Sequence, residues 1–122
     1  MKNPNDPNLE IRLPPAGSNY QSVEFYGDLD KAGQNIVQER IDKIVSDFNY
    51  PFLIFDFSNL NFINSEGIGL LMTIHSHLVK TNKELVIIGA KSNVKDVLDV
   101  IGIFSLLKYY RTLEDFLGNN TG

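Results

Sequence analysis

The chain has 122 residues, which is enough for one domain with its own hydrophobic core. It carries 15 acidic and 11 basic residues, for a net charge of −4, and no stretch gathers lysine and arginine into a basic face. Nucleic-acid binding is therefore disfavoured, because it needs such a face to neutralise phosphates. The chain has no cysteine, which excludes disulfides and thiolate metal sites.

Residues 1–19 are rich in proline and asparagine. We expect a poorly ordered leader there, apart from one short strand that could form at Leu9–Leu13. The leader lacks the apolar core of a secretory signal, and no apolar run reaches the ~20 residues of a membrane span. We therefore expect a cytoplasmic protein with no membrane association, a folded domain at 20–117 and a tail at 118–122.

The first half of the domain reads as strand, helix and strand. Alternating apolar residues predict a strand over Tyr20–Tyr26 that ends at the turn Gly27-Asp28. Apolar residues then recur at helical spacing from 36 to 48, and Tyr50-Pro51 ends that helix. Phe52–Phe57 is almost wholly apolar, which is typical of a strand buried on both faces of a parallel sheet.

The second half repeats the alternation. The predicted elements are a helix at Ser65–Lys80, a strand at Leu85–Ile88, a helix that Ser92 caps and Gly102 ends, a strand at Leu106–Tyr109, and a short helix opened by a capping box at Thr112–Asp115. The third helix should bury Val94, Val97, Leu98 and Ile101. This order predicts an α/β domain with a mainly parallel or mixed sheet and about four packed helices.

The segment from Asp56 to Leu71 carries the candidate chemistry, because function in such sheets sits where strands end and helices begin. Asp56 ends a buried strand, a polar loop follows, and Asn64 is placed to cap a helix that starts at Ser65. Gly67 and Gly69 each cost a helix up to ~1 kcal/mol relative to alanine. Two explanations remain open: the close approach of a bulky group, or packing against a neighbouring loop.

Five segments together match a known pattern. They are Gly27-Asp28-Leu29-Asp30, Asp56-Phe57-Ser58, Phe62-Ile63-Asn64-Ser65-Glu66-Gly67-Ile68-Gly69-Leu70-Leu71, Leu85–Gly89 and Ile101-Gly102-Ile103. Over roughly residues 20–117 the chain resembles the STAS-domain anti-sigma factor antagonists. In that family an aspartate usually stands where this chain has Asn64.

The resemblance implies a phosphorylation-controlled binding switch rather than an enzyme. Its protein partner would be an anti-sigma factor serine kinase, which is captured while Ser65 is unphosphorylated and which brings ATP and magnesium itself. The chain would need no cofactor and no metal. The residues expected to contact the partner are Asp28, Asn64, Glu66, Gly67, Leu70 and Ile74, and those expected beside the switch are Asp56 and Ser58.

Physical reasoning on the helix supports the same interpretation. A phosphate at a helix N-terminus meets the positive end of the helix dipole, so it need not unfold the helix. It adds about −1.5 to −2 charges to the surface, and Glu66 adds to the local repulsion.

The predicted buried stripe of this helix is Ile68, Leu71, Met72, Leu78 and Val79, with His75 at its centre. Leu70 then faces solvent, Ile74 lies at the margin, and both form an apolar partner patch.

Two alternative functions are also compatible with parts of the sequence. One is a constitutive STAS scaffold or transport-associated subunit without a phosphorylation switch. The other is a small hydrolase with Ser65 as nucleophile, which is disfavoured because His75 and His77 are about three helical turns away. His77 is expected in solvent, and histidines spaced i, i+2 point to different sides of a helix, so they do not suit a metal.

Overall fold

The computed structural model describes residues 7–120, which form one α/β domain with a five-stranded sheet. In chain order the elements are β1 (Leu9–Arg12), β2 (Tyr20–Leu29), α1 (Lys31–Ser46), β3 (Phe52–Ile63), α2 (Ser65–Val79), β4 (Glu84–Ile88), α3 (Ser92–Val100), a 3₁₀ turn η1 (Ile103–Ser105), β5 (Lys108–Tyr110) and α4 (Leu113–Asn120). The predicted fold class is confirmed.

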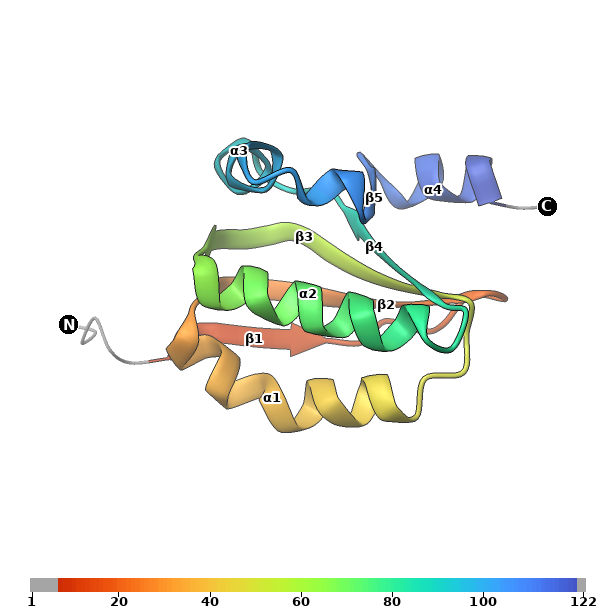
Figure 1. The fold of residues 1–122 in the computed structure, drawn as a ribbon, viewed down its shortest axis with the longest axis horizontal. Coiled ribbons are helices and arrows are strands. Elements are labelled where there is room, and N and C mark those ends of the chain that lie inside the picture. The colour runs from red at the N-terminus through yellow and green to blue at the C-terminus, as the bar shows by residue number, and fades with distance from the viewer. Residues whose placement is uncertain (1–6, 121–122) are drawn as a thin grey trace.

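The strands lie side by side in chain order (Figure 1). β2, β3, β4 and β5 are parallel to one another, while β1 pairs antiparallel with β2 at the edge. The short strand expected in the leader is thus present as β1, and the first six residues of the predicted leader lie outside the described part. The prediction that Phe52–Phe57 and Leu85–Ile88 form adjacent parallel strands is also confirmed.

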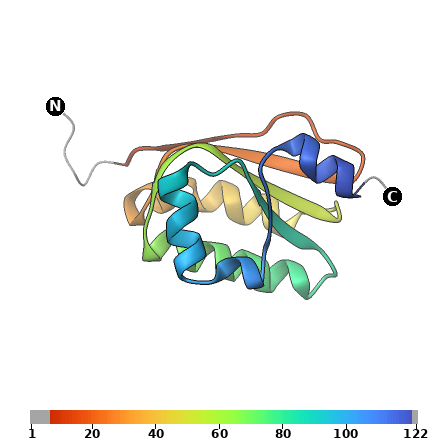
Figure 2. The same ribbon diagram turned by 90° about the horizontal axis from the view of Figure 1, so that it is seen from above.

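Helices cover both faces of the sheet, as Figure 2 shows from above. The larger core joins α1, α2 and α3 to one face, with the completely buried rings of Phe25, Phe55 and Phe57 at its centre. On the other face α4 packs a smaller cluster around Phe116, whose ring meets those of Tyr20, Phe52 and Tyr110 edge-on. This double cover explains the nearly continuous apolar sequences of β3 and β4.

β2 and β3 extend beyond their predicted ends, so the expected turn at Gly27-Asp28 and the polar loop after Asp56 are both strand. The two strands stay paired as far as Leu29 and Ile63 because two register shifts absorb the irregular stretch. Gly27 has φ +115°, and a Cβ there would lie 2.1 Å from the backbone oxygen of Asn8. A glycine whose sequence context indicates a turn is therefore needed for the close approach of the backbones at the start of β1 and the end of β2.

The predicted orientation of α2 is wrong. Its buried residues are Gly67, Leu70, Leu71, Ile74 and Leu78, because the helix packs against α1 as well as against the sheet. Leu70, expected towards solvent, and Ile74, expected at the margin, are only 5% and 4% exposed, whereas Val79, expected in the core, is 51% exposed. His75 is half-buried, and His77 is exposed as expected.

α3 also differs in detail from its prediction. Lys91, not Ser92, occupies the N-cap position and makes no side-chain capping bond, while Val97 and Ile101 are 39% and 49% exposed. Gly102 has φ +75°, which confirms the predicted left-handed residue after the helix. The Thr112 hydroxyl accepts a hydrogen bond from the backbone N–H of Asp115, as expected at the start of α4.

The new orientation of α2 predicts a large stability difference between two alanine variants of one helix. Leu70→Ala should lower the free energy of unfolding by about 2–5 kcal/mol, because it empties a buried site between α2 and α1. Val79→Ala should change it by less than about 0.5 kcal/mol, because that side chain is half in solvent. Urea denaturation measures both, and equal effects would contradict this packing.

Candidate functional site

Ser65 is the first residue of α2 and is exposed, immediately after β3 ends. The residue before it, Asn64, has extended backbone angles, and its side-chain oxygen accepts hydrogen bonds from the backbone N–H groups of Glu66 (3.1 Å) and Gly67 (3.2 Å). This confirms Asn64 as the N-cap. The cap satisfies two of the N–H groups that a helix leaves without intrahelical partners, so the first turn is stable with Ser65 in solvent.

Gly67 holds this turn against the end of β2. It is buried, and a Cβ at this position would lie 2.5 Å from the Leu29 oxygen and 2.8 Å from the Ile63 side chain. The Asn64 N–H also points to the Leu29 oxygen, at 3.4 Å. Of the two explanations for this glycine, packing within the chain is the correct one. Nothing lies within 4 Å of the Cβ position of Gly69, so the chain itself does not require glycine there.

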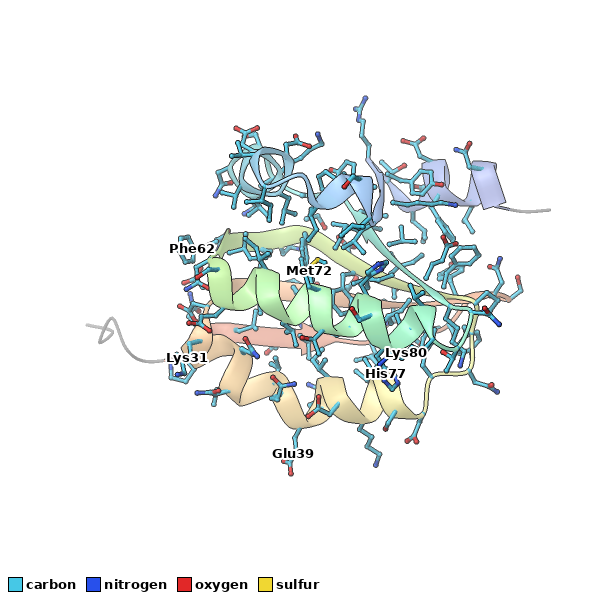
Figure 3. All side chains as sticks on the ribbon, in the orientation of Figure 1. Lys31, Glu39, Phe62, Met72, His77 and Lys80 are labelled. Carbon is cyan, nitrogen blue, oxygen red and sulfur yellow. The ribbon has the colours of Figure 1, made fainter. Side chains whose placement is uncertain are left out.

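Charged side chains of both signs lie at the end of the molecule where α2 begins. Glu66 is exposed in the first turn of α2, and Asp28, half-buried on β2, accepts a hydrogen bond from the Asn8 side chain at 3.1 Å. Lys31 begins α1 at the same end of the molecule, where Figure 3 labels it. The structure therefore brings Asp28, Asn64 and Glu66 together with Ser65 at the carboxyl ends of β2 and β3.

Asp56 and Ser58 lie elsewhere, so their predicted place beside the switch is wrong. The Ser58 hydroxyl and N–H both donate to the same Asp56 carboxylate oxygen, at 2.6 and 3.0 Å. Because β3 continues for seven more residues to Ile63, Asp56 is about 20 Å before the end of the strand. Its side chain shares the sheet face of Ile54, opposite to α2.

That opposite face is polar where α4 does not cover it. A pocket of about 600 Å³ is lined there by residues of β1, β2, β3 and the start of α3, including Glu10, Tyr26 and Lys91. Tyr26 donates a hydrogen bond to Glu24, which together with partial desolvation raises the pKa of the phenol, while the Arg12 guanidinium stacks on its ring.

Leu70 and Ile74 do not form the expected surface patch. They line the floor of a pocket of about 170 Å³ between α1 and α2, with Gln38, Asp42 and His77 at its sides. His75 is ten residues beyond Ser65, about 15 Å along the helix axis, which is too far for a base that activates the serine. Within residues 7–120, no group of three histidine or acidic side chains is placed to hold a metal.

One exposed aromatic residue was missed from the sequence. Phe62 on β3 is 48% exposed, between the buried residues Leu60 and Ile63, and it lies at the end of the molecule where α1 and α2 begin (Figure 3). In the first half of β3 nearly every residue is buried or half-buried, but after Phe57 only every third residue is buried, at Leu60 and Ile63. That change is the sequence signal for an outward-facing phenylalanine.

Comparisons with known proteins agree with this fold. The STAS domain family model matches residues 19–116, so the chain belongs to the STAS family. An anti-sigma factor antagonist from Mycobacterium paratuberculosis has a similar structure, with TM-score 0.82, 19% identity and full coverage of both chains.

The anti-sigma factor antagonist SpoIIAA is also similar in structure. In its unphosphorylated form the TM-score is 0.69 at 17% identity, over 93% of this chain and 99% of that one. The Bacillus SpoIIAA in its phosphorylated form gives 0.67 at 16% identity, over 90% and 98%. At these identities the likeness establishes the fold.

None of the helices within residues 7–120 has the length and apolar character needed to cross a bilayer.

The two glycines of α2 should respond oppositely to alanine. Gly67→Ala should destabilise the protein by about 1–3 kcal/mol, because the added methyl group meets backbone at 2.5 Å. Gly69→Ala should stabilise it by about 0.5–1 kcal/mol, because the methyl group enters open space and alanine favours the helix. Thermal unfolding of both variants tests this, and a destabilising Gly69→Ala would mean that the space beside Gly69 is occupied in solution.

Proposed function

We propose that this STAS domain is an anti-sigma factor antagonist controlled by phosphorylation of Ser65. The unphosphorylated protein binds an anti-sigma factor serine kinase. The kinase transfers the γ-phosphoryl group of its own ATP to the Ser65 oxygen, the hydroxyl proton is released, and ADP leaves. The phosphorylated protein then dissociates. In this proposal the chain supplies the acceptor and a binding surface, and it catalyses no reaction.

The observation that carries the proposal is the exposed Ser65 at the first turn of a capped helix. A kinase needs access to the hydroxyl, and the position gives it without local unfolding. Because the Asn64 side chain already bonds the N–H groups of Glu66 and Gly67, a phosphate on Ser65 does not have to replace the cap. The positive end of the α2 dipole favours the added anion.

The charge change is large for a site of this size. A phosphate adds about −1.5 to −2 charges within one residue of the exposed Glu66 carboxylate. Because the helix N-terminus accommodates the anion, we expect the fold to stay the same. The added charge then weakens the binding of a partner that covers this end of the domain. Further support comes from SpoIIAA, a protein of the same fold that has been solved in unphosphorylated and phosphorylated forms.

Three variants test the proposal against a panel of purified anti-sigma-type serine kinases from the same genome. Wild type should gain one phosphate with ATP, and Ser65→Ala should gain none and stay bound. Ser65→Asp should bind about tenfold or more weakly, since it places a fixed charge at the contact, although a carboxylate carries less charge than a phosphate. Thr73→Ala, an exposed hydroxyl two turns further along α2, is the control and should behave as wild type.

Intact mass and titration calorimetry read out these results. Phosphate on Thr73 or Ser58 in place of Ser65 would contradict the proposed acceptor. Equal binding by all variants with no phosphorylation would favour a constitutive STAS scaffold or transport-associated subunit instead.

A further inference from the structure

We propose that Phe62 is the aromatic anchor of the surface that Ser65 controls, and that the partner kinase covers it with an apolar pocket. This inference rests on the proposed function and adds the chemistry by which the partner is recognised. Recognition is then chiefly apolar, and the phosphate opposes it because a hydrated anion must be stripped of water when the pocket closes.

The exposure of Phe62 distinguishes it from the other phenylalanines. All eight phenylalanines of the chain lie in the described part, and seven are buried or half-buried. Phe62 is 48% exposed, and its partner on β2 is Asp28, whose carboxylate cannot cover a ring from water. Phenylalanine is among the aromatic residues enriched at the cores of protein interfaces, and an aromatic ring buries a large apolar area there.

The backbone around Phe62 is held in place. The Asn61 carbonyl accepts a hydrogen bond from the Asn93 side chain at 2.8 Å, and the Asn61 side chain accepts one from Lys91. On the other side, Ile63 is only 4% exposed and the Asn64 N–H points to β2. The start of α3 and the end of β2 thus hold the backbone on both sides of Phe62 in place. Partner binding therefore has little backbone to order, and little conformational entropy is lost.

Phe62 also lies within any ordinary interface centred on Ser65. The two residues are three apart in sequence, so their Cα atoms are at most about 11 Å apart. A protein interface of standard size covers about 800 Å² on each partner, which corresponds to a radius of about 16 Å. An interface of this size that is centred on Ser65 therefore extends as far as Phe62.

The charges at this end do not offer an alternative basis for recognition. The exposed charged side chains near the starts of α1, α2 and α3 include both signs, with Glu66 in the first turn of α2, Lys31 at the start of α1 and Lys91 before α3. Such a surface produces no strong field of one sign to steer a partner. We therefore expect the dissociation constant to change by less than about threefold between 50 and 500 mM NaCl, because apolar contacts are not screened by salt.

The test uses a purified anti-sigma-type kinase that binds wild type, and measures affinity by titration calorimetry. Phe62→Thr removes the ring but keeps a residue that suits a strand. It should weaken binding by about tenfold or more with an unchanged melting temperature. Val79→Ala is the matched control, because Val79 is an apolar residue that is 51% exposed at the C-terminal end of α2, far from Ser65, and it should bind as wild type. Phe62→Thr within about twofold of wild type, or an equal loss in both variants, would overturn the anchor.

Phe62→Trp gives a second measurement that does not depend on the threonine variant folding. The chain has no tryptophan, so this substitution adds a single fluorescent reporter at the site. Kinase addition should shift its emission to shorter wavelength as the ring leaves water, and phosphorylation of Ser65 should reverse the shift. An unshifted emission from a bound complex would overturn the inference.

The outcomes separate the two proposals. Wild type that binds none of the kinases overturns the proposed function, and the anchor with it. Binding that phosphorylation of Ser65 abolishes, but that is the same in wild type and Phe62→Thr, leaves the function in place and overturns the anchor alone.

Discussion

The contact between Gly67 and the end of β2 is the constraint on which the site depends. It brings the first turn of α2 so close to the Leu29 oxygen that no side chain fits between them. Because β2 and β3 are paired up to Leu29 and Ile63, this contact sets where β3 stops and where α2 begins. Asn64 falls at the boundary and caps the helix, and Ser65 follows as the first residue clear of the packing.

The packing of α2 explains why its ends and its middle differ in chemistry. The helix lies between the sheet and α1, so its buried stripe is wide enough to take in Leu70, Leu71, Ile74 and Leu78. The apolar residues in the middle of α2 are therefore buried in the core and do not form a binding surface. Exposed polar groups and the Phe62 ring remain at the N-terminal end, where β3, β2 and the start of α3 meet, and this is the surface that the proposed partner would contact.

The sequence predicts the fold well because its strongest signals are local. The apolar run of Phe52–Phe57, the breaking pair Tyr50-Pro51 and the cap at Asn64 each act within a few residues, and the structure has all three features. The errors come from contacts between distant segments. A helical wheel cannot tell which side of α2 meets α1, so it places Leu70 towards solvent and Ile74 at the margin, although both are buried. A polar stretch such as 58–62 reads as a loop unless its pairing with β2 is known.

The same contacts bear on how a single phosphate could act under the proposed mechanism. A hundredfold loss of affinity corresponds to about 2.7 kcal/mol. Burying an ion without a partner costs several kcal/mol even after relaxation. If binding buries a phosphate on Ser65 at the edge of an apolar contact with Phe62, the cost of desolvating the phosphate is therefore large enough for a hundredfold loss of affinity. No element of the fold has to move. The capped turn, the glycine contact and the anchored strand end favour this simple mechanism, because each resists the conformational change that an allosteric switch would need. Switching then consists of a change in the chemistry of one rigid surface.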